Sequence, residues 1–489
     1  MNNPTSMQGG TLTGVISVDA KQDPRIDNSG ANYPALTDNL VPVMHNGTTW
    51  VTADVTSSTS TYGWYDYDAK KWANAVLLTE TKRNSLTKDA KGNYTPGQTI
   101  GDTESDGVLA FYVWIPRYKY KVWNINKVVA TDTYGAQTKG IDIVFEEGTS
   151  TTGEITCTYD FTKTSSSTVR NEECTDGGNG YYTHPAFTFG SDELTGFWMG
   201  KFEMSSSSPA DESGGYITTN LTPRFLPNVR NWVVNMLSNY WLVVKNMQST
   251  NNIYGLSTNL TVADSHLITN MDWGAVAYLT HSKYGRCTSG SSSTCTEVSK
   301  NNSRNTSEYT SITGRSEGTV GTGSGSDAGT YTYNTDGGFL ASTTGTIYGV
   351  YDMHGGAMER TMGNSSQVSK GYTFYVSDAG SNYTYSGNEK YLTTYAYGES
   401  AIDQAAYNRG RLGDATGETL AILKVEQEMA GDAWYSDGTS MAKFWNPWFR
   451  RGGTANDGRD GGIFSVHFGS GGAEGYTTSR AVLTVFLTS

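Results

Sequence analysis

RRGGTANDGRDGGIFSVHFGSGGAEGYTTSRAVLTVFLTS, residues 450–489, carries the clearest structural signal in the chain. Gly452 and Gly453 permit a sharp backbone turn near its start, and the apolar run 481–487 predicts a buried strand at its end. Between them, apolar residues alternate with small or polar ones over 464–469, which is the period of a strand with one face turned inward. The segment therefore combines a fixed frame with a chemically varied surface, and we expect it to carry the functional site.

The overall composition favours a β-rich protein that works outside the cytosol. The chain has 489 residues, and its 35 Lys and Arg against 48 Asp and Glu give a net charge of −13. Such an acidic chain is a poor candidate for nucleic-acid binding. Charged residues make up only 17%, a profile typical of extracellular or virion proteins. No apolar run is long enough to span a membrane, and residues 1–30 show no signal-peptide pattern, so we expect release by lysis or a lost leader.

Four cysteines form two close pairs along the sequence, Cys157 with Cys174 and Cys287 with Cys295. Each pair encloses a polar loop, and this spacing favours two local disulfides over free thiols. A zinc site is the weaker alternative, because neither pair is CxxC and no histidine stands beside either pair at ligand spacing. Disulfides in turn favour an oxidising final location.

Composition shifts divide the chain into three parts. Residues 1–40 are a polar arm too small to fold alone, and we expect the arm to mediate attachment or oligomerisation. Residues 41–107 predict a small β-rich module that ends in a linker. Residues 108–489 predict the main domain, which contains a Ser, Thr and Gly-rich insertion at 287–345 that we expect to be a surface excursion.

Hydrophobic periodicity predicts an α+β main domain. A continuous apolar run at 108–115 predicts its first strand, and FWMGKF at 197–202 predicts another. Apolar residues at helical spacing predict one helix over 228–247 and a second over 270–284.

Patterns typical of enzymes are weak. The six histidines are scattered without metal-ligand spacing. GRSEG at 314–318 matches the GxSxG pattern of serine hydrolases but lacks the strand and helix that hold such a serine. Glu203 and Glu359 are the pair of carboxylates to consider for acid–base catalysis, although partners for arginine or backbone are the commoner fate of such acids. We therefore expect no enzymatic activity and no catalytic residue.

Five landmarks, in order, resemble the formylglycine-generating-enzyme-like (sulfatase-modifying-factor) branch of the C-type lectin fold. They are FWMGKFEMS at 197–205, DWGAVAY at 272–278, YGVYDMHGGAME at 348–359, RGGT at 451–454 and SRAV at 479–482. The resemblance implies a C-type lectin fold for the main domain and does not extend to residues 1–107. Formylglycine formation in that family requires cysteines near the C-terminal motif. No cysteine follows Cys295, so the resemblance does not imply oxidase activity here.

The non-enzymatic variable proteins of this branch, diversified by retroelements and including a phage tropism determinant, are the closer resemblance. In them, residues between the RGG turn and the final strand vary on an unchanged scaffold. The resemblance implies a ligand-binding variable segment at 450–480, with the contact residues Thr454, Ala455, Asn456, Asp457, Arg459, Asp460, Ser465, His467, Gly469, Ser470, Ala473, Glu474, Tyr476, Thr477 and Thr478. Trp434 and Tyr435 are candidates for its border, although tryptophan is more often core.

We therefore expect a receptor-binding protein, such as a phage tail-fibre protein on the virion, that attaches to a protein or glycan on a bacterial surface. A homotrimer would gain avidity, and the N-terminal arm would join other tail proteins. A bacterial surface or pilus-tip adhesin is the alternative, and a formylglycine-type oxidase the weaker rival. No cofactor is expected. Calcium stays open, because Asn456, Asp457 and Asp460 offer oxygen ligands without a full loop pattern.

Overall fold

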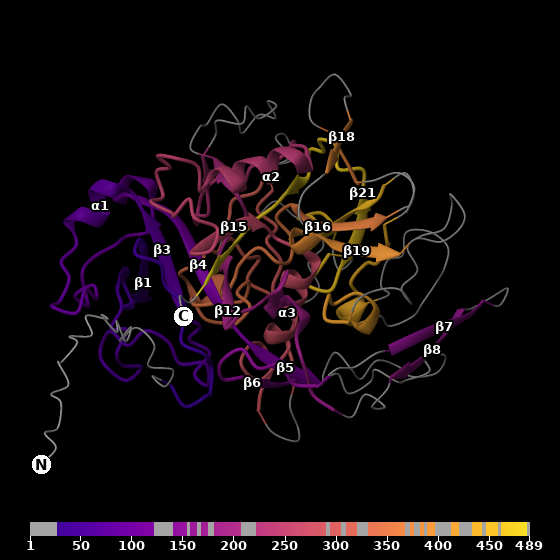
Figure 1. The fold of residues 1–489 in the computed structure, drawn as a ribbon, viewed down its shortest axis with the longest axis horizontal. Helices are drawn as coiled ribbons and strands as arrows, with labels where there is room; N and C mark the ends of the chain where they lie inside the picture. The colour runs from indigo at the N-terminus through magenta and orange to yellow at the C-terminus, as the bar shows by residue number, and fades with distance from the viewer. Residues whose placement is uncertain are drawn as a thin grey trace, which may run out of the picture.

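The computed structural model of the chain shows an α+β protein with many strands and few helices (Figure 1). It describes residues 27–121, 140–153, 157–163, 168–174, 180–206, 222–289, 294–304, 310–319, 331–366, 372–375, 382–385, 389–396, 412–419, 433–442, 446–457 and 461–486.

A seven-stranded sheet forms the centre of the described structure. In sheet order its strands are β15 (Ala263–Leu267), β23 (Ala481–Val485), β12 (Gly196–Gly200), β4 (Val108–Pro116), β3 (Asn74–Leu78), β1 (Leu40–His45) and β2 (Trp50–Thr52). Every neighbouring pair is antiparallel.

The apolar runs at 108–115 and 481–487 predicted two of these strands. Every residue of β4 and of β23 is buried, which explains why their sequences are almost unbrokenly apolar rather than alternating. Strand β12 pairs with both: Trp198 lies opposite Trp114 on one side and Leu483 on the other. The C-terminal strand thus lies inside the sheet, between β12 and β15.

Residues 41–107 contribute to the same sheet as the main domain. Strands β1, β2 and β3 form one end of it, and β3 pairs directly with β4, for example Val76 with Phe111. The predicted boundary at residue 108 therefore falls between two hydrogen-bonded neighbouring strands.

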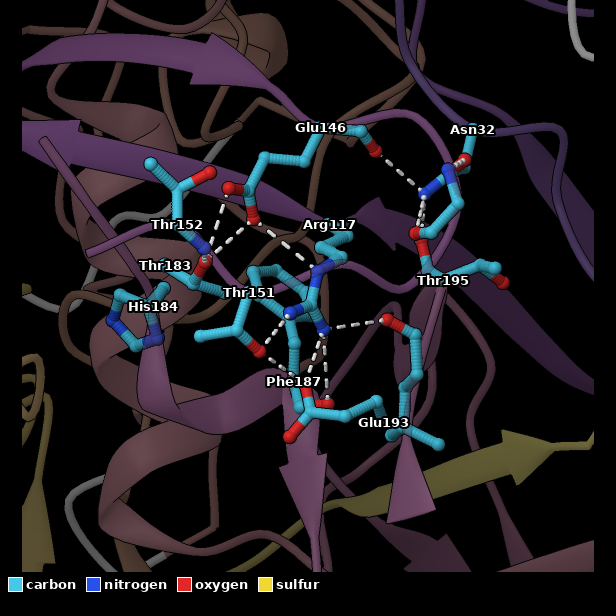
Figure 2. Close-up of polar contacts among 12 residues, drawn as sticks. Asn32, Arg117, Glu146, Thr151, Thr152, Thr183, His184, Phe187, Glu193 and Thr195 are labelled. Atoms are coloured by element: carbon cyan, nitrogen blue, oxygen red, sulfur yellow. Dashed lines mark hydrogen bonds and ion pairs between the residues drawn. The ribbon is translucent and has the colours of Figure 1, made fainter. Parts of the chain in front are cut away.

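The described end of the N-terminal arm packs against this chain. Residues 1–26 lie outside the described residues, but Ala31, Tyr33 and Ala35 are buried in the main core. The side-chain amide of Asn32 donates to the backbone carbonyls of Glu146 (2.8 Å) and Thr195 (3.1 Å), as Figure 2 shows.

Figure 2 also shows the buried guanidinium group of Arg117, which contacts several segments of this region. Arg117, which is fully buried, forms ion pairs with Glu146 (3.2 Å) and Glu193 (2.7 Å) and donates to Thr151 Oγ1 (3.0 Å). Thr183 Oγ1 donates to the same Glu146 carboxylate at 2.8 Å. Because a buried charge is costly unless it is paired, this network fixes the geometry of the segments it joins.

A second sheet has five strands. Its path is β19 (Thr393–Ala396), β16 (Met358–Ser366), β20 (Trp448–Arg451) and β21 (Val466–Gly469), and β22 (Thr477–Thr478) pairs with β16. In Figure 1, β16, β19 and β21 lie on the opposite side of α2 and α3 from β1 and β3.

Shorter elements complete the described structure. The remaining strands are β5 (Tyr118–Lys121), β6 (Asp142–Phe145), β7 (Cys157–Lys163), β8 (Thr168–Cys174), β9 (Tyr182–Thr183), β10 (Thr188–Phe189), β11 (Asp192–Glu193), β13 (Ser205–Ser206), β14 (Pro223–Arg224), β17 (Tyr372–Tyr375) and β18 (Asn382–Tyr385). The α-helices are α1 (Glu80–Ser85), α2 (Leu237–Asn246), α3 (Asn270–Thr280) and α4 (Asp336–Phe339), and the 3-10 helices are η1 (Glu104–Asp106), η3 (Pro185–Phe187), η5 (Glu389–Tyr391), η7 (Gly417–Thr419) and η8 (Trp434–Ser436). The β7–β8 hairpin projects away from the rest of the molecule (Figure 1).

The two predicted helices have different outcomes. Helix α3 confirms the second, and it begins in a capping box in which Thr269 and Asp272 bond each other's backbone amides. The first helix was predicted over 228–247, but α2 begins only at Leu237. Residues before it bond elsewhere: the Asn231 amide donates to the Ser311 carbonyl (2.9 Å) and the Val234 amide to the Glu474 carbonyl (3.2 Å).

The predicted disulfide between Cys287 and Cys295 is present. Strands β7 and β8 place Cys157 opposite Cys174, and that disulfide stays a prediction.

Contrary to our expectation of a surface excursion, many residues in the described part of the insertion at 287–345 are buried. Ser299, Asn301 and Thr313 are fully buried. The Asn301 side-chain amide and the Gly314 backbone amide both donate to the buried carboxylate of Asp352, at 2.8 and 2.9 Å respectively. Polar residues are needed here because they satisfy a buried acid, so polarity did not indicate exposure.

Candidate functional site

The segment 450–480 connects the two sheets. It leaves β20, turns, returns as β21, passes through a loop to β22, and enters β23 in the seven-stranded sheet. Strand β21 covers Val466–Gly469, the later part of the predicted alternation. Both ends of the segment therefore lie in or beside sheets, and loops join the strands between them.

The glycine pair makes the turn after β20 possible. Gly452 and Gly453 have φ angles of +86° and +69°, which glycine tolerates best. A Cβ on Gly453 would lie 2.3 Å from the Gly461 Cα, so the two backbones touch. Across the turn, Trp273 Nε1 donates to the Ile463 carbonyl at 2.8 Å.

Arg451 holds the backbone of the segment through buried hydrogen bonds. Its buried guanidinium donates to the carbonyls of Ser465 (2.7 Å), Asp414 (2.8 Å) and Ala415 (2.9 Å). The Phe464 amide donates to Asp437 Oδ2 at 2.8 Å. These buried bonds hold the segment in one conformation without using the side chains that it displays.

The structure divides the predicted contact residues into two groups. Those with exposed or half-buried side chains are Asn456, Asp457, His467, Ser470, Ala473, Glu474 and Tyr476. Those that are buried, and so do not face a ligand as we expected, are Thr454, Ala455, Ser465, Gly469, Thr477 and Thr478. Arg459 and Asp460 lie outside the described residues.

The buried group has structural roles that alternation and composition did not indicate. Thr477 and Thr478 form β22, and Thr477 Oγ1 accepts from Arg360 Nε at 3.0 Å. The carbonyl of Ser465 accepts from Arg451, and a Cβ on Gly469 would lie 3.2 Å from the Arg450 side chain. Small polar residues here fill tight places in the frame.

Three basic side chains form a row across the second sheet. Arg360 on β16 lies opposite Arg450 on β20, and Arg450 lies opposite His467 on β21. Glu474 Oε2 accepts from Arg450 (2.8 Å) and Arg360 (3.1 Å). The Arg450 guanidinium also lies 5.3 Å from the centre of the Tyr476 ring, a cation–π contact.

This row gives the exposed residues a charged, rigid base. Burial lowers the pKa of His467 to about 4, so its imidazole is neutral at pH 7. Arg360 Nη1, Arg450 Nε and His467 Nε2 are buried and find no hydrogen-bond partner within the described part of the chain. Sequence reasoning did not single out Arg450 within the segment, and it missed Arg360 because only strand register brings that residue to the segment.

The carboxylates considered for catalysis have structural partners. Glu359 forms a fully buried ion pair with Arg480. Glu203 accepts from the Asn231 side chain and from the Ala357 amide (2.8 Å), and burial raises its pKa well above the usual value. The Ser316 hydroxyl of the GRSEG motif donates to Ser299 Oγ at 3.1 Å, and both serines are buried.

The fold brings a histidine to a cysteine pair, which sequence spacing did not indicate. Ligand atoms of His281, Cys287 and Cys295 lie within 4.8 Å of one another. The two sulfurs are joined as a disulfide and are not thiolates, the form that binds metal.

Trp434 is fully buried against Phe464, with ring centres 5.1 Å apart, so it belongs to the core.

Tyr435 and Asp457 complete the residues predicted at or beside the segment. Tyr435 is half-buried, and its hydroxyl lies 3.1 Å from His281 Nδ1. Asp457 Oδ2 accepts from the Thr454 amide at 2.6 Å within the turn. Since Asp460 is outside the described residues, calcium binding stays an open prediction.

No protein-family model matches the chain, and no curated protein matches it either. Among the described residues, no helix has both the length and the apolarity needed to cross a bilayer.

Proposed function

We propose that this chain is a non-enzymatic receptor-binding protein on a C-type lectin scaffold, and that residues 450–480 are its contact surface. One observation carries the proposal: seven predicted contact residues are exposed or half-buried on a segment whose backbone is held by buried bonds. A rigid frame under varied side chains suits recognition, because ordering costs are met before the ligand arrives.

The side chains of this surface suit adaptable binding. Tyr476 offers an aromatic ring whose orientation the Arg450 guanidinium restrains, while Asn456 and Ser470 offer small polar groups. Aromatic anchors surrounded by short polar residues are typical of binding surfaces that accept many partners. The proposed partner is a protein or glycan on a bacterial surface.

The proposed context is a phage tail fibre, in which a homotrimer presents three copies of the surface and the N-terminal arm joins other tail proteins. The alternative is a bacterial surface adhesin with the same contact surface. Attachment to whole bacteria is expected of the tail-fibre protein, so a panel of bacterial strains tests this context first.

The experiment compares binding of the purified protein and two variants to that panel. The test variant changes Asn456, Ser470 and Tyr476 to Ala, which spares the buried anchors. The control changes Leu260, which is 44% exposed and lies outside the segment, to Ser. We expect the test variant to lose binding while its Tm stays close to that of the control.

Equal binding by both variants would contradict the assignment of the contact surface to 450–480. Binding lost together with a large fall in Tm would instead indicate damage to the frame, and single substitutions would then be compared.

A further inference from the structure

A cavity of about 470 Å³ lies on a different part of the molecule from the C-terminal segment. Its walls come from η3 and the β10 turn, from β15, from the first turn of α3, and from η5 and β19. No residue of 450–480 lines it. A cavity of this size, built from segments distant in sequence, falls in the range of small-molecule sites.

Two buried polar side chains, His266 and Asp272, line the cavity, with His266 Nε2 and Asp272 Oδ2 3.9 Å apart. His266 Nδ1 lies 3.3 Å from the Asp264 carbonyl, which can only accept, so Nδ1 carries the proton and Nε2 is an acceptor. Thr269 donates twice to Asp272, and both bonds end on Oδ2. Within the described residues, Asp272 Oδ1 therefore keeps its capacity to accept.

Two further charged residues, Glu389 and Lys390, line the cavity. Lys390 lines the cavity, but its Nζ pairs with Asp264 Oδ2 at 2.9 Å and lies 4.5 Å from the centre of the Phe189 ring. Phe189 stacks on His266 with ring centres 4.7 Å apart. Burial lowers the pKa of His266 to about 4, so the imidazole is neutral at pH 7.

The chemistry of the lining selects among ligands. An anion would meet the Asp272 and Glu389 carboxylates and the His266 Nε2 acceptor, with Lys390 already paired. Hydroxyl groups, in contrast, donate to such acceptors, and acceptors on two adjacent side chains suit a ligand that carries several hydroxyls. Met271 and Leu392 add apolar wall that can contact C–H groups.

We propose that this cavity binds a neutral polyhydroxylated ring of monosaccharide size, with its hydroxyls donating to His266 Nε2 and Asp272 Oδ1. The proposal is independent of the function assigned to the C-terminal segment. It adds a second, separate site of defined chemistry to the molecule.

The test uses the full chain and simple probes. Glucose, galactose, mannose and N-acetylglucosamine are each titrated and followed by saturation-transfer NMR and by the ring-proton signals of the six histidines. Glucuronic acid and inorganic phosphate serve as charged contrasts. We expect at least one neutral sugar to bind with a Kd on the order of 1 mM and to shift the His266 signal, assigned from a His266→Gln spectrum.

Two variants locate the binding. Met271→Trp places bulk in the cavity and should abolish binding, while Asp272→Asn removes the charged acceptor and should weaken it by about tenfold. Leu260→Ser, at an exposed side chain outside both the cavity and the C-terminal segment, is the matched control and should bind the sugar like the parent. Thermal unfolding of every variant identifies any variant that fails to fold. If Met271→Trp does not fold, Asp272→Asn still tests the location of the site.

Three outcomes would overturn the proposal: no transfer to any neutral sugar, stronger binding of the charged probes, or unchanged sugar binding by a folded Met271→Trp or Asp272→Asn variant.

Discussion

The two larger sheets differ in the kind of side chain that the strands compared here bury. In the seven-stranded sheet, β4 and β23 are buried along their whole length and almost entirely apolar. In the second sheet, adjacent strands carry the buried charges of Glu359, Arg360 and Arg451. Apolar burial stabilises without direction, whereas a buried charge costs free energy unless its partners stand at the right distance. The first sheet can therefore supply stability, and the second can supply the fixed geometry on which an exposed surface depends.

Arg480 joins the two regions. It lies just before β23, forms the buried ion pair with Glu359 on β16, and donates to the carbonyls of Gly200 (2.9 Å) and Tyr351 (3.0 Å). The strongest tests of the comparison begin at this contact.

The largest effect is expected from Glu359→Gln. It keeps the shape of the side chain but removes the ion-pair partner of the buried Arg480 charge, leaving Asp352 and Glu203 as acids that act on it without an ion-pair contact, which should cost about 3–5 kcal/mol of unfolding free energy. Denaturant unfolding measures the loss. The double variant Glu359→Leu with Arg480→Met should lose less than the single variant, because both charges are removed together. A single variant within about 1 kcal/mol of the parent would contradict the role given to this ion pair.

Leu483→Ala should come next, because Leu483 is fully buried between β12 and β15. Lost apolar burial and the cavity left behind should lower the unfolding free energy by about 2–5 kcal/mol. Leu260→Ala, at a 44% exposed side chain, is the control and should change it by less than about 0.5 kcal/mol. Similar losses for the two variants would show that β23 does not supply the stability assigned to it.

The smallest effect concerns His467, which should make stability depend on pH. Its pKa is lowered to about 4 in the folded chain, so on acidification the unfolded chain takes up the proton first. Its contribution is fully present above the unfolded pKa of about 6.5 and is lost as pH falls toward 4. His467→Gln should therefore lose less stability than the parent across this window, measured by denaturant unfolding at several pH values. Parallel curves would contradict the burial of this imidazole.

Sequence patterns identified elements whose own residues fix their structure. The apolar runs that became β4 and β23 must be buried wherever they lie, and the Thr269 and Asp272 pair caps α3 through local bonds. The helix predicted over 228–247 was wrong in its first half, because its backbone bonds residues more than 70 positions away, such as Ser311 to Asn231. Periodicity over a short window carries no information about such partners.

The candidate surface shows the same division. Glycine tolerance and apolar alternation are local properties, so they were enough to predict a turn, a strand and a varied loop before a buried strand in 450–480. The tertiary structure was needed to show which of its residues face outward, as the burial of Ser465 and Thr477 shows, and which cations lie beneath them. It also decided that His266 and Asp272 share a cavity. Strand register and packing between distant segments set these contacts, and neither can be inferred from the spacing of residues along the chain.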